Sequence, residues 1–241
     1  MKASGKTGSL FSGTLFFLLF LAGCGPFYRT VVVMAPVGTG EYEIDSGTGI
    51  CKIEKAGVKF TLSFQKRKEL EAISPYPAWN PYLNEQKIFY SVFKLVVENT
   101  RQDKISVDMS KAVLLDGLGN QESALMTEYF KGIYPESTKV QQQRGLRGFD
   151  YSEIVIYTED YYRYNAAERT IFKAREVFPE VKMEGYLVFN IVRREAGSVT
   201  VVLPGVKLLG AKCEEEGKTE ELRFKFVHSV SVKESTADDK R

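Results

Sequence analysis

Three cysteines and one histidine are the side chains of this 241-residue chain best suited to nucleophilic or metal chemistry. Cys24 ends an apolar run near the start, and Cys51 and Cys213 stand far from it and from each other. A thiolate can attack an acyl or alkyl donor, bind a metal or form a disulfide. His228 is the only histidine, so a multi-histidine zinc site is excluded and a Ser-His-Asp triad would require this residue. We expect His228 to be a hydrogen-bonded residue near the end of a strand.

Other motifs typical of enzymes are absent from the sequence. It contains no Gly-x-Ser-x-Gly, no His-Glu-x-x-His and no Cys-x-x-Cys. Gly217-Lys218-Thr219 matches the end of a phosphate-binding loop, but Lys212 occupies the position where that loop requires a glycine. The glutamates of residues 214–221 suit a solvated turn, because a calcium site needs several oxygens that converge on one point. We therefore expect a protein that is not an enzyme and holds no cofactor or metal.

The residues before Cys24 are organised like an export signal. Lys2 and Lys6 supply positive charge, and the mostly apolar residues 10–21 follow them. A helix that crosses a bilayer needs about 20 apolar residues, so this segment is too short to span one. The run Leu21-Ala22-Gly23-Cys24 then resembles the lipobox of bacterial lipoproteins.

This resemblance implies that residues 1–23 are a signal peptide and that a lipid is attached to the sulfur of Cys24. Cleavage before Cys24 and acylation of its new amino group would then anchor the protein to a membrane without a membrane-spanning segment. Gly25 follows the lipid site, whereas an Asp there would resemble an inner-membrane retention signal. We therefore expect a location in the bacterial cell envelope, at the outer membrane if the host is Gram-negative.

Removal of the signal peptide changes the charge balance. The chain has 33 Lys and Arg against 31 Asp and Glu, and Lys2 and Lys6 both belong to residues 1–23. The remaining chain thus carries equal numbers of basic and acidic residues. Since nucleic-acid binding usually requires a basic surface, we expect no nucleic-acid partner.

Cys51 and Cys213 are the two cysteines left after lipidation of Cys24. In an oxidising envelope compartment they can form a disulfide that closes a long loop and stabilises the fold by roughly 4–5 kcal/mol. Alternatively, they are two buried thiols that pack as small apolar side chains. The sequence leaves both alternatives open.

The body of the chain has the pattern of β-strands. Apolar and polar residues alternate over residues 58–65 and 222–233, as expected for strands with one buried face. Residues 88–97 are apolar in both parities, which indicates a central strand. Further strands are expected at residues 105–109, 112–115, 154–157, 186–192 and 199–203, with a hairpin turn at residues 196–198 between the last two. We predict a mainly β fold, an immunoglobulin-like antiparallel β-sandwich.

One helical insertion is expected at about residues 165–178. Asn165 can cap its start, Glu168 stands three residues later, and Pro179 ends it. A short helical turn is also expected within residues 66–73.

The remaining segments divide the chain into four parts. Residues 1–23 are the signal peptide, residues 24–49 a lipidated N-terminus and tether, residues 50–233 the sandwich domain, and residues 234–241 a flexible tail.

A second resemblance concerns the fold. Residues 93–107 and 114–119 are similar to immunoglobulin-like domains of bacterial exported lipoproteins, in which a strand ends in Asn and later strands close on an Asp-x-x-Gly turn. Residues 185–205 resemble the later strands of those domains. The similarity covers about residues 87–232. Many such domains are of unknown function, so the resemblance supports the fold more than an activity.

Tyr76, Trp79 and Tyr82 lie in a proline-rich loop and are the strongest candidates for contact with a ligand or partner. Rigid aromatic side chains can stack on sugars or anchor a protein. The alternative is a loop that folds back over a sheet face. A second aromatic group, within residues 157–164, offers a recognition surface or packs the helix against the sheets.

We expect a non-enzymatic envelope lipoprotein that binds other envelope proteins or supports an assembly. The alternative is a ligand-binding, glycan-binding lipoprotein that uses the aromatic loop 76–82. An enzyme with an unfamiliar Asp, Glu or Tyr site is the third hypothesis. The sequence leaves the oligomeric state open.

Overall fold

The computed structural model describes residues 28–84, 87–134, 138–144, 151–209, 217 and 219–234. The chain divides into two compact units, residues 1–31 with 231–241 and residues 32–230. Of the first unit, the structure describes only the start of β1 (Tyr28–Pro36) and the end of β15 (Leu222–Glu234). The signal peptide, Cys24, Cys213 and the tail after residue 234 lie outside the described residues.

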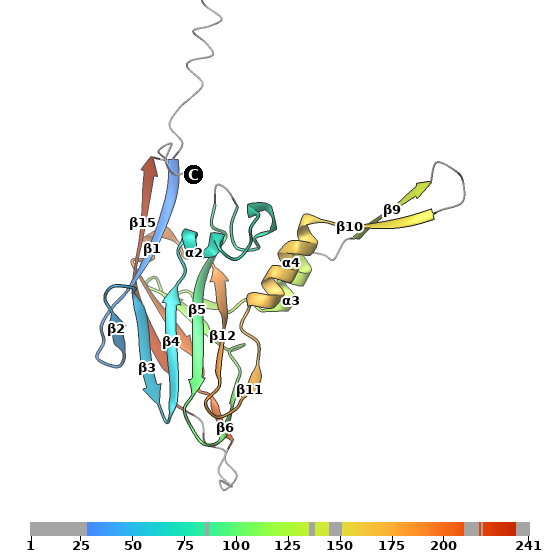
Figure 1. Cartoon of the computed structure of the whole chain (residues 1–241). Helices are drawn as coiled ribbons and strands as arrows, with labels where there is room; N and C mark the ends of the chain where they lie inside the picture. The colour runs from blue at the N-terminus through green and yellow to red at the C-terminus, as the bar shows by residue number, and fades with distance from the viewer. Residues whose placement is uncertain are drawn as a thin grey trace, which may run out of the picture. The chain divides into compact units, whose positions relative to one another are not determined.

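The second unit is mainly β, with antiparallel sheets (Figure 1). One five-stranded sheet has the order β1-β15-β13-β7-β8, and a second has the order β12-β5-β4-β3-β2. A three-stranded sheet has the order β11-β6-β14, and β9 and β10 pair as a hairpin. The strands not yet defined are β2 (Glu43–Asp45), β3 (Ile50–Lys55), β4 (Val58–Phe64), β5 (Tyr90–Asn99), β6 (Lys104–Val107), β7 (Val113–Asp116), β8 (Gln121–Ser123), β9 (Thr138–Arg144), β10 (Tyr151–Tyr157), β11 (Arg175–Val177), β12 (Lys182–Asn190), β13 (Ser198–Leu203) and β14 (Lys207–Leu209).

Alternation along the sequence is matched by alternation of burial. In β4, Phe60 and Leu62 are fully buried, whereas Lys59 between Val58 and Phe60 is exposed. In β15, Phe224 is fully buried and its neighbour Lys225 is exposed. The predicted strands at 58–65 and 222–233 are therefore confirmed, and their alternation has the expected cause.

The two five-stranded sheets share one hydrophobic core. The rings of Phe93 in β5 and Phe226 in β15 lie 5.2 Å apart, and both side chains are fully buried. Burial of each such side chain contributes about 1.5–3 kcal/mol to the stability of the fold. This core therefore joins strands that are more than a hundred residues apart in the sequence.

Strand β5 is buried on both faces, as its apolar sequence predicts. While Phe93 belongs to the core between the sheets, Val92 belongs to a second cluster on the other face of β5. This cluster includes Leu70 of α2 (Arg67–Glu71), Phe130 of α3 (Thr127–Ile133) and Ala167 of α4 (Glu159–Thr170). The helices thus cover the outer face of this sheet near β5.

The main helix, α4, overlaps the predicted range 165–178 only at residues 165–170, because it begins and ends earlier in the chain, so the predicted bounds are wrong. Thr158 caps α4, because its hydroxyl accepts a hydrogen bond from the Tyr161 amide at 3.4 Å. Asn165 is inside the helix and donates to the Tyr161 carbonyl at 2.8 Å. The chain leaves the helix at Ile171, because the next amide, that of Phe172, donates to the Tyr186 carbonyl of β12 at 2.9 Å. The short turn expected within residues 66–73 is confirmed as α2.

The hairpin expected at residues 196–198 does not form. Strand β12 pairs with β5, whereas β13 pairs with β7 and β15 in the other five-stranded sheet. The connection contains a 3-10 turn, Arg194–Ala196, and then Gly197 at φ 63°. The turn residues therefore carry the chain from one sheet to the other.

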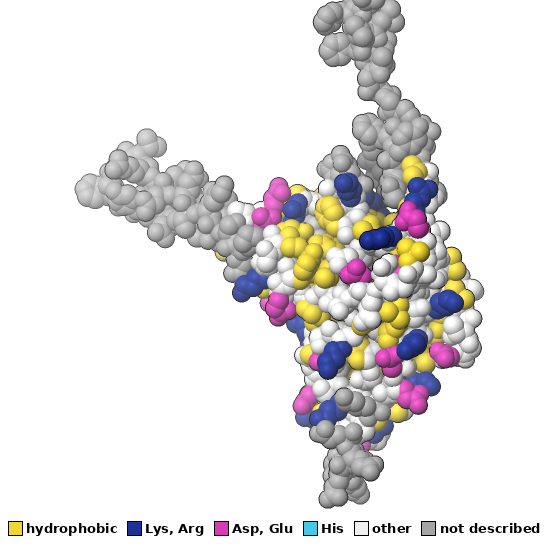
Figure 2. Space-filling model, turned by 180° about the vertical axis from the view of Figure 1, so that it is seen from behind, with side chains coloured by type: hydrophobic (Ala, Val, Ile, Leu, Met, Phe, Trp, Pro, Cys, Tyr) yellow, Lys and Arg dark blue, Asp and Glu magenta, His cyan; other side chains and the backbone are white. Residues whose placement is uncertain are grey.

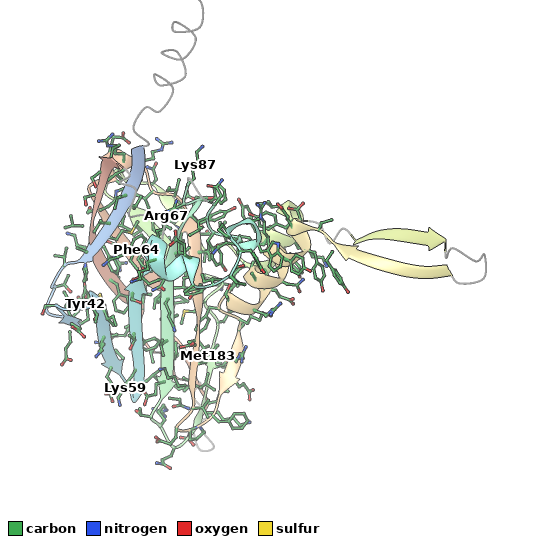
Figure 3. The ribbon with its side chains drawn as sticks, turned by 45° about the horizontal axis from the view of Figure 1, so that its top comes forward. Tyr42, Lys59, Phe64, Arg67, Lys87 and Met183 are labelled. Carbon is green, nitrogen blue, oxygen red and sulfur yellow. The ribbon has the colours of Figure 1, made fainter. Side chains whose placement is uncertain are left out.

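Part of the segment expected to be a tether forms strands. Residues 28–45 include β1 and β2, and Met34 and Tyr42 are buried in the core between the sheets. The Tyr42 hydroxyl accepts a hydrogen bond from the Lys225 amide of β15 at 3.0 Å. The Tyr42 side chain is labelled in Figure 3. The described strands therefore begin before residue 50. Within the described ranges, no helix is both long and apolar enough to cross a membrane.

Candidate interaction surface

Two segments that are far apart in the sequence bring aromatic rings together. They are the 3-10 turn η1 (Pro77–Trp79) and the first turns of α4. The ring of Trp79 stacks on that of Tyr162, with centroids 4.1 Å apart and planes at 16°. The Arg163 Nε–H donates to the Ala78 carbonyl at 2.6 Å and fixes the turn to the helix.

Trp79 is covered by a ring on each face. The Tyr76 ring lies 4.2 Å from the Trp79 ring, tilted by 56°. A centroid distance of this size places Tyr76 over a face of the indole, and two rings so close cannot share one face. Tyr76 and Tyr162 therefore lie on opposite faces of Trp79.

The row of rings continues along α4 toward the hairpin β9–β10. Tyr162 contacts Tyr161 at 5.6 Å, and Tyr161 stacks on Tyr157 at 4.2 Å with planes at 28°. Tyr157 ends β10 and Tyr161 lies in the first turn of α4, so their stacked rings join the strand to the helix. We call the five residues Tyr76, Trp79, Tyr162, Tyr161 and Tyr157 the aromatic stack. Its two outer members are the most exposed, Tyr76 at 54% and Tyr157 at 44%.

Charged side chains border the aromatic stack. An Arg163 nitrogen lies 3.8 Å from a Glu159 oxygen, and another lies 3.8 Å from an Asp160 oxygen. The Glu159 and Asp160 side chains are 64% and 42% exposed, so solvent screens these ion pairs and each stabilises the fold little. The start of α4, which carries Tyr161 and Tyr162, thus also carries this one cation and these two carboxylates.

Tyr82, the third aromatic residue expected at the surface, is fully buried. Its hydroxyl lies 2.6 Å from that of Thr170 at the end of α4. Burial raises the pKa of Tyr82 well above its usual range, and the Thr170 hydrogen bond lowers it by less. Tyr82 therefore packs the loop against the helix and offers no ring face to a ligand.

His228 is buried, with 4% of its surface exposed. Neither ring nitrogen has a hydrogen-bond partner within the described part of the chain, which differs from the hydrogen-bonded histidine expected from the sequence. Burial also lowers the pKa of His228 below its usual value. His228 thus occupies an inward position of β15, where its enclosure favours the neutral imidazole.

Cys51 is fully buried in β3. Burial raises the pKa of its thiol to about 12, so the thiolate is scarce at neutral pH. Cys24 and Cys213 lie outside the described residues, so lipidation of Cys24 and a Cys51–Cys213 disulfide stay predictions.

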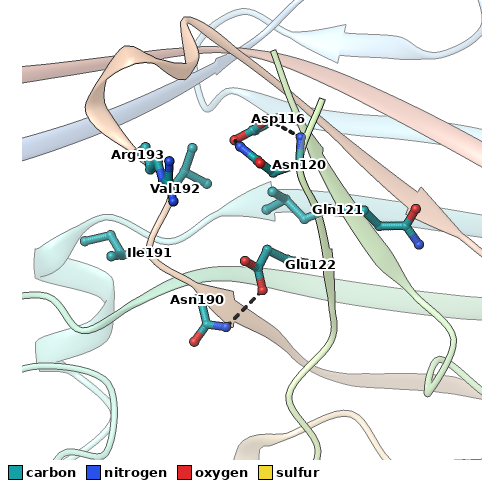
Figure 4. Close-up of a pocket in the computed structure, with 9 residues that line it drawn as sticks. Asp116, Asn120, Gln121, Glu122, Asn190, Ile191, Val192 and Arg193 are labelled. Carbon is teal, nitrogen blue, oxygen red and sulfur yellow. Dashed lines mark hydrogen bonds between the residues drawn. The ribbon is translucent and has the colours of Figure 1, made fainter. Parts of the chain in front are cut away.

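A polar pocket of about 240 Å³ lies between the β7–β8 turn and the segment after β12 (Figure 4). On one wall, the Asn120 side chain donates to Asp116, which holds the pKa of that carboxyl below its usual value. Across the pocket, the Asn190 amide donates to Glu122 at 3.0 Å. Its carboxylates and amides thus bond mainly to each other, and the lining supplies no nucleophile with an adjacent base.

The arrangement of charged and metal-binding side chains bears on metal and nucleic-acid binding. Among the described residues, no three His, Cys, Asp or Glu side chains cluster as metal ligands would. Basic and acidic side chains are interspersed on the face of the molecule that Figure 2 shows. The absence of a nucleic-acid partner stays a prediction.

Comparison with known proteins identifies no family. No protein-family model matches the chain, and no curated protein matches it. Among solved structures, the crystal structure of collagen adhesin (CNA) from S. aureus is similar over 86% of this chain and 80% of that chain, with 8% identity and a TM-score of 0.20. A TM-score this low supports no conclusion about fold or function.

Proposed function

We propose that this chain is a non-enzymatic envelope lipoprotein that binds a protein partner through the aromatic stack. The observation that carries the proposal is the exposure of Tyr76 and Tyr157 at the two ends of a rigid row of rings. Large aromatic side chains lose little conformational entropy on binding and are enriched at the centres of protein interfaces. The pinning of η1 to α4 by Arg163 presents these rings in a fixed arrangement.

A protein partner fits the stack better than a glycan does. Stacking on a sugar needs an open ring face, and both faces of Trp79 are covered by Tyr76 and Tyr162. Tyr82 is buried. The glycan alternative is thus restricted to the outer faces of Tyr76 and Tyr157, and the tests below distinguish it.

The anchor in this proposal is an acylated Cys24, which follows from the resemblance of residues 21–24 to a lipobox. We expect attachment to the outer membrane if the host is Gram-negative, because Gly25 follows the lipid site. The variant Cys24→Ser should lose acyl labelling and leave the membrane fraction. Unchanged labelling and fractionation would overturn the lipoprotein assignment.

The fold in this proposal is an immunoglobulin-like β-sandwich made by the two five-stranded sheets. Its support is the shared core and the contact of Phe93 with Phe226. Nuclear Overhauser effects between these two rings in solution would agree with the sandwich. Their absence, with both resonances assigned, would contradict it.

Site-specific photo-crosslinking in intact cells tests the partner. A photoreactive phenylalanine analogue replaces Tyr76 or Tyr157, and replaces Phe178 in a matched control because Phe178 is 53% exposed at the β11–β12 turn. We expect a discrete protein adduct from the first two positions and none from the third. Recovery of the lone chain from both stack positions would contradict a protein partner.

The glycan alternative predicts a different pattern. Purified cell-wall glycan would retain the wild-type protein, and the double variant Tyr76→Ala/Tyr157→Ala would lose this retention. If the wild type is not retained, the alternative fails.

A further inference from the structure

We propose that the aromatic stack recognises a cationic segment of its partner, one that presents arginine or lysine side chains. This inference rests on the proposed protein-binding function and specifies the chemistry of the partner. It is carried by the exposed ring surface of the stack together with the two carboxylates beside it.

The exposed rings are suited to cations. The face of an aromatic ring carries negative partial charge and attracts an ammonium or guanidinium group within about 6 Å. Tyr157 is 44% exposed and Tyr76 is 54% exposed, so both offer ring surface to a partner. The same chemistry occurs within this chain, where the Arg163 guanidinium lies 5.6 Å from the Tyr134 ring centroid.

The carboxylates of Glu159 and Asp160 can accept further hydrogen bonds. Arg163 is the cation near both Glu159 and Asp160, and each nitrogen–oxygen distance is 3.8 Å. A charge-assisted hydrogen bond is about 2.7–2.9 Å long, so neither contact is one. Neither carboxylate accepts a hydrogen bond from any other described residue. The Arg163 Nε–H is already bonded to the Ala78 carbonyl.

Charge balance then selects the partner. Among the side chains that the structure describes at the start of α4, Arg163 against Glu159 and Asp160 leaves an excess of one negative charge. An acidic segment would meet like charge at Glu159 and Asp160 and at the ring faces. A purely apolar segment would cover the carboxylates and remove their water without replacing its hydrogen bonds. A cationic segment can place its charged groups over the ring faces and also donate hydrogen bonds to the carboxylates.

Trp79 provides a direct readout, because it is the only tryptophan of the chain. Its fluorescence therefore reports on the stack alone. The full-length protein, purified in detergent, is titrated with a blocked hexa-arginine peptide, and hexa-glutamine and hexa-glutamate peptides serve as controls. The anisotropy of fluorescently labelled peptides gives a second, independent measurement of binding.

We expect a saturable change of Trp79 emission with hexa-arginine, and Kd values at least ten-fold weaker with the other two peptides. Glu159→Gln should weaken hexa-arginine binding about three-fold, and Glu159→Gln/Asp160→Asn about ten-fold. The matched control Glu43→Gln removes the same charge from an exposed position in β2 and should leave the Kd unchanged. Circular dichroism confirms that the variants are folded.

Equal binding of the three peptides, or no binding of hexa-arginine in either measurement, would overturn the inference. Failure of the inference and failure of the proposed function are distinguishable. Photo-crosslinks from Tyr76 and Tyr157 that map to a segment without Arg or Lys refute the cationic specificity but leave the protein-binding function. Arginine-peptide binding without any cellular crosslink refutes the protein-binding function instead.

Discussion

The phenol oxygen of Tyr82 lies 2.6 Å from the hydroxyl oxygen of Thr170, 88 residues later in the chain. The Thr170 hydroxyl also donates to the Ala166 carbonyl at 2.6 Å. Because a threonine hydroxyl has one proton, Tyr82 is the donor and Thr170 the acceptor in the bond that joins the aromatic loop to the end of α4.

This assignment predicts unequal effects of two conservative changes. Tyr82→Phe removes the donor and should lower the free energy of unfolding by about 1 kcal/mol. Thr170→Val leaves the buried Tyr82 hydroxyl without an acceptor and should lower it by about 1–3 kcal/mol. Urea unfolding of both single variants and the double variant measures the difference. A larger loss for Tyr82→Phe would reverse the donor assignment.

The β3–β4 hairpin predicts a second pair of effects. Lys55 pairs with Val58, and the two residues between them have positive φ, Ala56 at 50° and Gly57 at 71°. Such a loop favours Asn-Gly. Ala56→Asn should therefore stabilise the protein by about 0.5 kcal/mol, since asparagine tolerates this conformation better than alanine.

Gly57→Ala is the opposite case. Its Cβ would lie 2.9 Å from Cγ of Arg101, in a backbone conformation that L-residues avoid. We expect a loss of about 1–2 kcal/mol in the free energy of unfolding. If Ala56→Asn and Gly57→Ala shift the urea midpoint in the same direction, this description of the turn is wrong.

The burial of His228 predicts a pH dependence of stability. Its folded-state pKa is below the usual value of 6.5, so the unfolded chain binds a proton that the folded protein does not. Above pH 6.5 this proton uptake does not reduce the free energy of unfolding. As the pH falls from 6.5 toward the folded-state pKa, the free energy of unfolding decreases, at no more than about 1.4 kcal/mol per pH unit.

His228→Leu isolates this effect, because the chain has no other histidine. As the pH falls from 7 to 5, the unfolding free energy of the wild type should fall relative to that of the variant. Parallel pH profiles would show that His228 is not the group responsible.

Cys51 should resist alkylation in the folded protein. Its side chain is fully buried, and burial raises its thiol pKa to about 12. Mass spectrometry after iodoacetamide treatment should show Cys51 unmodified under native conditions. In denaturant without reductant, modification of both Cys51 and Cys213 would exclude the disulfide, and modification of neither would support it. Rapid labelling of Cys51 in the native protein would contradict its burial.

Local sequence patterns predicted where the strands lie in the chain better than they predicted which strands pair with each other. Alternating polarity identified β4 and β15, because each has one face in the core and one in solvent. The same kind of pattern could not show that β12 and β13 belong to different sheets. Turn residues such as Gly197 indicate where a chain changes direction, but the pairing of the strands on either side depends on the whole core.

The helix and the aromatic site illustrate the same limit. The sequence predicted Asn165 as the cap, whereas Thr158 caps α4 and the helix ends where Ile171 and Phe172 reach β12. There, Gly185 admits the Phe172 backbone, since a Cβ would lie 2.7 Å from its Cα. Proline spacing indicated a rigid aromatic loop, but the burial of Tyr82 follows from a contact with α4 that no local pattern encodes.

The place of β15 has a consequence for how the molecule is made. β15, the last strand of the described residues, lies inside its sheet, between β1 and β13. Until residues 222–234 have left the ribosome, the sheet cannot close and the Phe93–Phe226 contact cannot form. Pairings this distant in sequence also fold slowly. Completion of this core therefore waits for β15, in whatever order the other strands pair.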